Sequence, residues 1–584
     1  MTHATRVPAH VQNGRGVARA PERRAGHVLG GPTLSGLALG LVFWLEALTP
    51  TLIARSWLVQ AVTSGVCLAI GYGIGTLVGH WVQRLLVRSD RLPGGLIRRR
   101  GWIVLGVAWV IAVPVGAVVW LGWQNEQREF MGIQPTLDWF DALRMVALSA
   151  VVGVLLVLVG RVIANGVGAV NRVIGRRLPD IVAVPVTAAL IALLVFAIGG
   201  KVLVPALTAL AESLFAPANE ETEPGLVMPT SPAVSGSPAS YVAWDTLGRL
   251  GRRFAATATT AEELAQVHGA NAELAEPVRV YVGMHSADSA AQRAELAVRE
   301  LERAGGFDRK VLVVWVPTGT GWVIEHAAAA IEQLYRGNSA IVAIQYSALP
   351  SLVGVFLDAG QQDEAGDALF NAVYAHWSQL SPDHRPKLLL FGKSLGTSGV
   401  EAPFVGEDAA SSVANMVART DGMLIVGAKE SNPIHGQLTR AREPGSPIWQ
   451  PIFDGGRSVR FVNRDPNQPV LDPNWPPPRI VYLQHPSDPV TFWSLDAIWR
   501  PQEFMAPPLG FDVPRAMRWF PIVSGVQAVG DLLDQLAPPP GFGHVYSTDY
   551  VRAWVSILPP DNWTEADTQR VEKFVDAIDG DESE

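Results

Sequence analysis

Cysteine and charged side chains are both scarce in this chain of 584 residues. Cys67 is the single cysteine, which excludes an intramolecular disulfide and a cysteine-based zinc site. Charged residues make up 17% of the chain, against roughly 25% in an average soluble protein. Together with 48% hydrophobic residues and a mean hydropathy of +0.20, this argues against a wholly soluble enzyme and against a disordered chain. The length predicts about three or four domains.

Positive charge is also scarce in the second part of the chain. Residues 1–210 carry 19 Lys and Arg against 8 Asp and Glu, whereas residues 211–584 carry 27 against 46. Such asymmetry indicates two parts that lie in different surroundings. The acidic part lacks the basic surface that nucleic-acid binding requires, so we expect no nucleic-acid partner.

Long apolar stretches dominate the basic part. Each is close to the ~20 residues that cross a ~30 Å hydrocarbon layer as a helix, and tryptophans lie at several of their ends. Buried helices of a large soluble domain are the alternative, but five nearly charge-free runs within 210 residues favour a membrane. We predict transmembrane helices over 33–54, 57–82, 102–123, 145–164 and 181–207. They form a membrane domain at 33–210, which follows a basic tail at 1–32.

Arginines gather in alternate connections between these stretches. They occupy the N-terminal tail, the connection at 83–101 and the segment at 172–177, whereas the connection at 124–144 holds four acidic residues, Glu126, Glu129, Asp138 and Asp141. Under the positive-inside rule, this alternation predicts a cytoplasmic N-terminus. Five crossings then place everything after residue 207 on the extracytoplasmic side. An even number of crossings would reverse that side.

Polar residues are sparse along the predicted spans. Glu46 lies inside the first, where it is either a functional intramembrane carboxylate or a paired packing residue. Because no polar run resembles a transport path, we expect the spans to act as an anchor.

The chain then passes through a linker into a region of alternating strands and helices. Residues 211–240 are rich in Pro, Ser, Gly and acidic side chains, which predicts an extended tether. From residue 241, apolar runs alternate with helical patterns, which predicts a mostly parallel sheet covered by helices on both faces. The expected strands are 278–284, 310–316, 340–346, 387–391, 422–428, 479–484 and, more weakly, 518–523; the expected helices are 288–304, 322–335 and 363–380.

A nucleophile motif follows one of these strands. Residues 392–396 read Gly392, Lys393, Ser394, Leu395, Gly396, directly after an apolar strand and before a helical pattern. In a G-x-S-x-G turn the serine hydroxyl stands clear, and the glycines leave room for the neighbouring strand and helix. A Gly/Ser turn without chemistry is the alternative, but this strand–turn–helix context favours Ser394 as a nucleophile.

An activated serine needs a histidine base and a carboxylate that orients it, in the chain order Ser, acid, His. Asp488 follows the strand at 479–484, and His544 lies in a Gly/Pro-rich loop near the C-terminus. We predict these two residues as acid and base. The weaker candidates are His485, His435, His285 and His326 for the base, and Asp421 and Asp496 for the acid.

The oxyanion donors should be the amide after the nucleophile and an amide from the loop that follows the strand at 310–316. These are Leu395 and, in the loop at 317–322, Thr318 and Gly319. That loop carries no Walker lysine and does not fit G-x-G-x-x-G, so we expect no nucleotide.

Residues 429–478 are rich in Pro, Arg and Trp and lie where such folds insert a cap or lid. Trp449, Phe453 and Trp475 either line an acyl pocket, face the bilayer or pack within an irregular subdomain.

Four motifs together resemble the α/β-hydrolase superfamily: FGKSLG at 391–396, VPTGTGW at 316–322, HPSDPV at 485–490 and GFGHVY at 541–546. Over most of residues 30–560, the chain resembles an actinobacterial family that joins N-terminal membrane spans to a C-terminal α/β-hydrolase domain, here 241–584. This resemblance implies a serine hydrolase. The chain departs from common esterases in lacking an HGG-type oxyanion motif.

We therefore expect a multi-pass membrane protein whose partners are the bilayer and an acyl ester or thioester, lipidic or from the cell envelope. Neither a metal nor an organic cofactor is expected. A non-catalytic scaffold or sensor on the same fold is the first alternative. A transporter with an appended domain and a peptidase or epoxide hydrolase are the others, and epoxide hydrolases use an aspartate nucleophile instead of serine.

Overall fold

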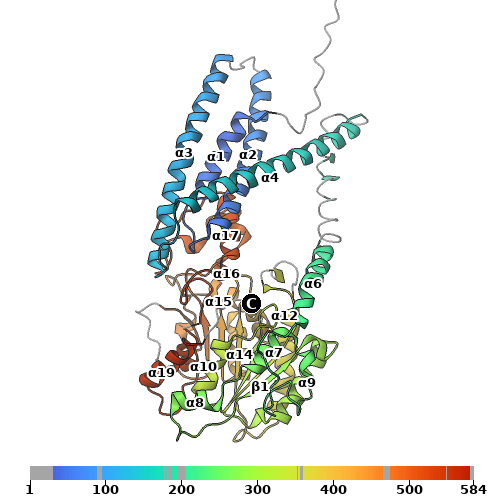
Figure 1. Ribbon diagram of the computed structural model, residues 1–584, viewed down its shortest axis with the longest axis vertical. Helices are drawn as coiled ribbons and strands as arrows, with labels where there is room; N and C mark the ends of the chain where they lie inside the picture. Colours follow the sequence, from blue (N-terminus) through green and yellow to red (C-terminus); the bar gives the residue numbers. More distant parts are fainter. Residues whose placement is uncertain are drawn as a thin grey trace, which may run out of the picture.

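A computed structural model describes residues 31–88, 95–176, 204–351, 360–464, 474–547 and 549–578, with a few single residues between these ranges. The chain folds into a group of long helices at one end and an α/β domain at the other (Figure 1).

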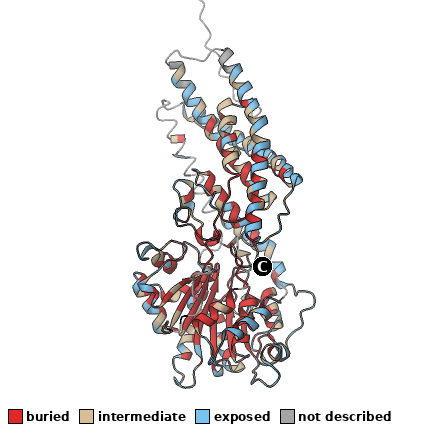
Figure 2. Cartoon of the chain, turned by 90° about the vertical axis from the view of Figure 1, so that its left-hand side faces the viewer, coloured by how far each residue is buried: buried red, intermediate tan, exposed pale blue. Residues whose placement is uncertain are grey.

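The α/β domain is built on one parallel sheet of seven strands in the order β1-β3-β2-β4-β5-β7-β6. The strands are β1 (Val278–Val282), β2 (Val311–Val316), β3 (Ser339–Ile344), β4 (Lys387–Lys393), β5 (Gly422–Val426), β6 (Val459–Val462) and β7 (Arg479–Leu483). The inner strands are buried along nearly their whole length, which explains their continuous Val, Ile and Leu runs (Figure 2). The predicted α/β class and parallel sheet are confirmed.

Helices cover both faces of this sheet. The chain reverses its direction across the sheet between β2 and β3, and right-handed crossovers then place successive helices on opposite faces. Accordingly α9 (Ala290–Ala304) packs with α12 (Gln361–Trp377), while α10 (Glu325–Leu334) packs with α18 (Tyr550–Ile557) and α19 (Glu565–Val575). The remaining helices of the domain's first part are α7 (Gly248–Ala256) and α8 (Ala261–His268).

Two details of the sheet differ from the prediction. Residues 518–523 form no strand, because Phe520 and Ile522 pack against the N-terminal helices instead of a neighbouring strand. The expected insertion at 429–478 holds α15 (Pro433–Arg440) and the edge strand β6, so part of it belongs to the α/β layer. With four residues and alternating burial, β6 lacks the continuous apolar run of its neighbours.

Four described helices form the N-terminal domain: α1 (Leu34–Glu46), α2 (Trp57–Arg88), α3 (Gly95–Phe130) and α4 (Trp139–Ile174). Segments of three are long and apolar enough to cross a membrane, namely Trp57–Gln83, Arg99–Phe130 and Trp139–Ile174. Their outer faces expose large apolar side chains, up to 75% of Val110 (Figure 2). Such continuous apolar surface is compatible with a membrane protein.

The first and the fifth expected spans do not appear among the membrane-length helices found within the described residues. The first, at 33–54, is helical only over the 13 residues of α1, because Pro50 and the residues around it leave the helix. The fifth, at 181–207, lies mostly outside the described residues, and its last four residues begin α6 (Val204–Glu220).

The expected linker at 211–240 is not a loose tether. Its first part continues α6 (Val204–Glu220), and Val234 forms a β-bridge with Arg279 at the edge of the sheet. The buried Glu300 carboxylate accepts hydrogen bonds from the Ser240 hydroxyl (2.6 Å) and the Tyr241 amide (2.9 Å). These non-local contacts attach the segment to the α/β domain, and its Pro/Ser/Gly composition gave no sign of them.

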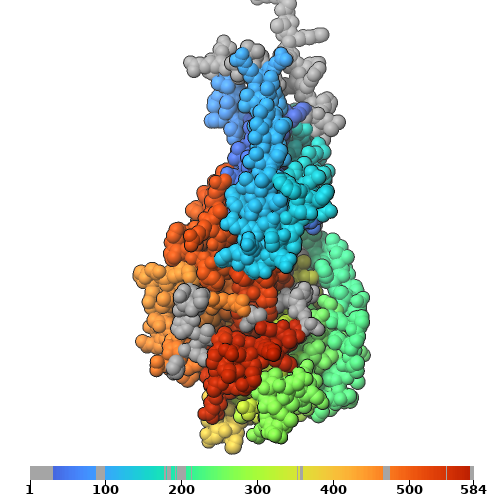
Figure 3. All heavy atoms as spheres, turned by 60° about the vertical axis from the view of Figure 1, so that its left-hand side comes forward, coloured from blue at the N-terminus to red at the C-terminus, as the bar shows by residue number. Residues whose placement is uncertain are grey.

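One helix of the second half lies between the two domains. α17 (Val523–Leu533) packs beside α1 and α2, so the orange part of the chain adjoins the blue helices (Figures 1 and 3). Its carboxyl end leads toward the loop that carries His544.

Candidate active site

Ser394 occupies the sharp turn between β4 and α13 (Gly396–Glu401). Its backbone has φ of +53°, a left-handed conformation that strains a residue other than glycine. The Ser394 amide donates to the Val426 carbonyl of β5 at 3.0 Å, which holds the turn against the neighbouring strand. A strained backbone persists only where surrounding contacts hold it in place, and such positions are frequent in active sites.

The glycines on either side of Ser394 are required by close backbone contacts. A Cβ atom on Gly392 would lie 2.6 Å from the Gly396 carbonyl oxygen, and one on Gly396 would lie 2.2 Å from that of Val316. Neither backbone atom can move away as the end of a side chain could. The geometry thus supplies the reason for the G-x-S-x-G spacing.

Asp488 lies just after β7 and is fully buried. Its carboxylate accepts hydrogen bonds from His544 Nδ1 (2.8 Å), the Tyr546 hydroxyl (2.6 Å) and the Val490 amide (2.8 Å). Burial by itself raises the pKa of Asp488, but the attraction to His544 and these hydrogen bonds outweigh burial and lower the pKa. The structure therefore holds Asp488 as an anion beside the His544 ring.

His544 lies in the loop between α17 and α18. With Nδ1 bonded to Asp488, its buried Nε2 has no hydrogen-bond partner among the described residues. A Cβ on Gly427 would lie 2.5 Å from His544 Cε1, so β5 also leaves room for this ring. Buried polar atoms are nearly always paired, so an unpaired Nε2 at the wall of a cleft is poised to accept a proton.

Ser394 and His544 line the same cleft, whose volume is about 360 Å³. The loop after β2 contributes Thr318 and Trp322 to the lining. The end of α17 and the segment after it, Leu532–Ala537, form another wall. The full lining is Thr318, Trp322, Pro350, Ser351, Lys393, Ser394, Leu532, Leu533, Asp534, Gln535, Leu536, Ala537 and His544. The structure thus brings the predicted nucleophile and base to one cavity.

The competing histidines and acids lie elsewhere or have other partners. The His435 ring bonds Gln484, and burial lowers its pKa to about 4. Asp421 pairs with Lys387 at the opposite end of β4, and Asp496 pairs with Arg500 on the surface. Neither His285, at the end of β1, nor His326, on α10, lines the cleft.

His485 supports the histidine loop. Its Nδ1 lies 2.9 Å from the Gly543 carbonyl and its Nε2 lies 3.0 Å from an Asp549 carboxylate oxygen. Burial lowers the pKa of His485, but the hydrogen bond and charge of Asp549 outweigh it, so the pKa is raised. Because both ring nitrogens face acceptors, the imidazolium form makes both hydrogen bonds and fixes the backbone next to His544.

The three predicted oxyanion donors differ in whether their backbone amides already donate a hydrogen bond within the protein. The Leu395 amide donates to no protein acceptor among the described residues. The Thr318 amide already donates to the Trp322 carbonyl at 3.2 Å, and the Gly319 amide donates to Ser351 Oγ at 3.0 Å. Leu395 is therefore ready to stabilise an anion, whereas Thr318 and Gly319 must first exchange a partner. Ser351 follows β3 from a distant part of the sequence, so the motif could not reveal this hydrogen bond.

The three aromatic residues of the expected cap pack within the protein instead of lining the cleft. Trp449 belongs to an apolar cluster with Ile53 and Phe492, and its ring nitrogen donates to the Pro508 carbonyl. Trp475 and Phe453 pack with the core of the sheet. The cleft wall instead comes from Leu532–Ala537, for which no sequence motif gave a signal.

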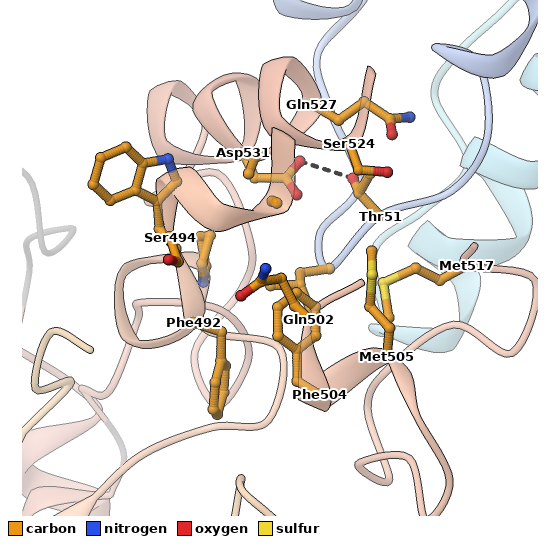
Figure 4. Close-up of a pocket in the computed structure, with 15 residues that line it drawn as sticks. Thr51, Phe492, Ser494, Gln502, Phe504, Met505, Met517, Ser524, Gln527 and Asp531 are labelled. Atoms are coloured by element: carbon orange, nitrogen blue, oxygen red, sulfur yellow. Dashed lines mark hydrogen bonds between the residues drawn. The ribbon is translucent and has the colours of Figure 1, made fainter. Parts of the chain in front are cut away.

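A second and much smaller cavity, of about 20 Å³, lies against α17 and is shown in Figure 4. Phe492, Phe504, Met505 and Met517 give it an apolar lining, and Thr51 of the N-terminal domain reaches across to Asp531. Neither Ser394 nor His544 lines it. Over the described ranges, no group of three or more His, Cys, Asp or Glu side chains is arranged to hold a metal ion.

Comparison with protein-family models gave two matches, which together cover most of the chain. Residues 278–571 match the model described as "Alpha/beta-hydrolase family", and residues 48–258 match that described as "Alpha/beta-hydrolase family N-terminus". No curated protein and no solved structure matched the chain.

Proposed function

Because the chain belongs to the alpha/beta-hydrolase family, we propose that it is a membrane-anchored serine hydrolase that cleaves carboxylic esters or thioesters. The observation that carries this proposal is the His544–Asp488 pair at 2.8 Å, with the unpaired His544 Nε2 in the cleft that Ser394 lines. A strained serine, an imidazole with an unpaired ring nitrogen and a buried carboxylate are the three parts that acyl transfer requires.

The proposed reaction begins when Ser394 Oγ attacks the acyl carbonyl and His544 Nε2 takes its proton. Asp488 stabilises the imidazolium that forms and keeps Nδ1 protonated. The Leu395 amide donates to the oxyanion, and a second donor at Thr318 or Gly319 would exchange its present partner for that oxygen. His544 then protonates the leaving alcohol or thiol. Water, activated by the same imidazole, releases the acid and restores Ser394.

Membrane anchoring and its direction are part of the proposal. The α1–α2 and α3–α4 connections meet the α/β domain, since the Arg55 side chain after α1 donates to Asp531, and Phe130 at the end of α3 packs on Phe542. The end of α2 at Arg88 and the start of α3, which carries Arg98, Arg99 and Arg100, are at the far end of the N-terminal domain (Figure 1). By the positive-inside rule, the α/β domain would then lie on the extracytoplasmic side.

The test is labelling of intact cells with a membrane-impermeant fluorophosphonate, which reacts with activated serines. We expect labelling of the wild type and of Ser381→Ala, which changes an exposed serine remote from the cleft, but none of Ser394→Ala. Labelling that appears only in broken cells would keep the nucleophile and reverse the orientation. If the folded wild type reacts in neither state, the protein is a non-catalytic scaffold and the proposal fails.

A further inference from the structure

α17 connects the apolar N-terminal domain to the candidate active site. At its amino end, Phe520, Ile522, Val523 and Val526 form a cluster with side chains of α1 and α2, including Phe43, Cys67, Ile70 and Ile74. Ile70 lies near the middle of the segment Trp57–Gln83, about 20 Å along the helix from Trp57. If α2 crosses the bilayer, as proposed, this end of α17 reaches into the hydrocarbon region.

The carboxyl end of α17 reaches the catalytic cleft. Leu532 and Leu533, the last residues of the helix, line the cleft together with Ser394 and His544. The helix of 11 residues, about 16 Å long, therefore runs from the cluster that contains Ile70 to the wall of the cleft.

The two faces of α17 differ in chemistry. Gln527 and Asp531, one turn apart, hold the N-terminal domain: Asp531 accepts from Thr51 (2.8 Å) and Arg55 (2.7 Å), and Gln527 donates to the Thr49 carbonyl (3.2 Å). Figure 4 shows this polar side, where Thr51 and Asp531 meet. The polar face is thus fully used in joining the two domains.

The opposite face is apolar and exposed. Val529 and Leu533, four residues apart, are 38% and 49% exposed, and Leu536, just beyond the helix, is 38% exposed. Exposed apolar side chains are common when they are scattered. Val529 and Leu533 lie on one side of α17, because residues four apart share a face of a helix, and Leu533 and Leu536 both line the cleft, so the three form a row that ends there.

We propose that this row, Val529, Leu533 and Leu536, is the track along which the acyl chain of a membrane lipid ester reaches Ser394. This inference rests on the proposed function and assigns its substrate class. The row starts beside the cluster that α17 forms with α2 and ends in the cleft that Ser394 lines, so a chain lying on it has its apolar part toward the bilayer and its ester in the cleft. Contact with this apolar row removes the acyl chain from water, which favours its passage along the row.

The test uses the full chain in detergent micelles and compares acetyl, octanoyl and dodecanoyl esters of one chromogenic alcohol. Each methylene that the track buries should raise kcat/KM about fourfold until the track is full. We expect the double variant Val529→Asn/Leu533→Gln to lower kcat/KM for the dodecanoyl ester at least tenfold and that for the acetyl ester less than threefold. Val405→Asn, which changes a valine 45% exposed outside α17 and the cleft, is the matched control and should alter neither.

The rate at which a short-chain fluorophosphonate labels Ser394 separates the possible failures. Normal labelling of the double variant shows that it is folded and that its nucleophile is intact. Two results with a normally labelled double variant would overturn the track but not the proposed hydrolase activity. In one, the variant retains the chain-length preference of the wild type; in the other, it loses activity equally toward all three esters. A wild type that is neither labelled nor active toward any ester overturns both.

Discussion

At the scale of single residues, Asp488 differs from the other candidate acids in its surroundings. It is buried against His544 and accepts three hydrogen bonds, whereas Asp496 forms a surface pair with Arg500. An asparagine at 488 keeps the shape of the side chain but removes the charge that orients and stabilises the imidazolium. We expect Asp488→Asn to lower kcat by about 1000-fold or more with little change in KM, and Asp496→Asn to be close to wild type. Steady-state kinetics on a soluble ester would measure both, and equal effects would remove Asp488 from the triad.

His485 makes the stability of the protein depend on pH. Its pKa is raised in the folded state, so the stability it contributes is fully present below the unfolded value of about 6.5 and is lost as the pH rises through the folded pKa. His485→Gln should therefore lower the melting temperature most at acidic pH, and the difference from wild type should shrink at alkaline pH. Thermal unfolding across this range measures it. A difference that grows with pH would show that the neutral ring is the form that holds Gly543.

At the scale of elements, two ion pairs join the second half of the chain to the N-terminal helices and differ in burial. Arg55 and Asp531 are buried at 2.7 Å, whereas Arg518, beside Glu46 at 2.9 Å, has a side chain 60% exposed. Asp531→Asn leaves the Arg55 guanidinium without its counter-charge, and we expect the free energy of unfolding to fall by about 3–5 kcal/mol. The corresponding loss for Glu46→Gln should be below about 1 kcal/mol. Denaturant unfolding in detergent would compare them, and similar losses would mean that α17 is not held by the buried pair.

The segment just before α17 shows why a sequence pattern can predict the wrong element. The run at 518–523 has the composition of a strand, yet Phe520 and Ile522 find apolar partners on α1 and α2. Propensity describes a residue in an average environment, and here tertiary contacts with helices about 450 to 480 positions earlier override it. For the same reason, the wall formed by Leu532–Ala537 carries no local motif.

At the scale of the whole molecule, the α/β domain packs against the N-terminal helices. Val523 is completely buried against α1 and α2, and Gly543, beside His544, lies against Ile53. Residues 241–584 expressed alone would expose this apolar surface to water. We expect that fragment to associate in size-exclusion chromatography and to label with fluorophosphonate at least tenfold more slowly than the full chain. A monomeric fragment that labels at the full rate would show that the histidine loop needs no support from the N-terminal domain.

The sequence by itself determined the features that depend on local order. Continuous apolar runs specify buried parallel strands, long charge-free runs specify membrane-length helices, and a glycine-flanked serine after a strand specifies a sharp turn. Chain order alone pointed to Asp488 and His544, which the structure brings to hydrogen-bonding distance. Tertiary structure decided the rest: the partners of the Thr318 and Gly319 amides, the packing of Trp449, the edge strand β6 and the position of α17. Each of these depends on contacts between residues far apart in the chain, and such contacts form only when the elements pack together.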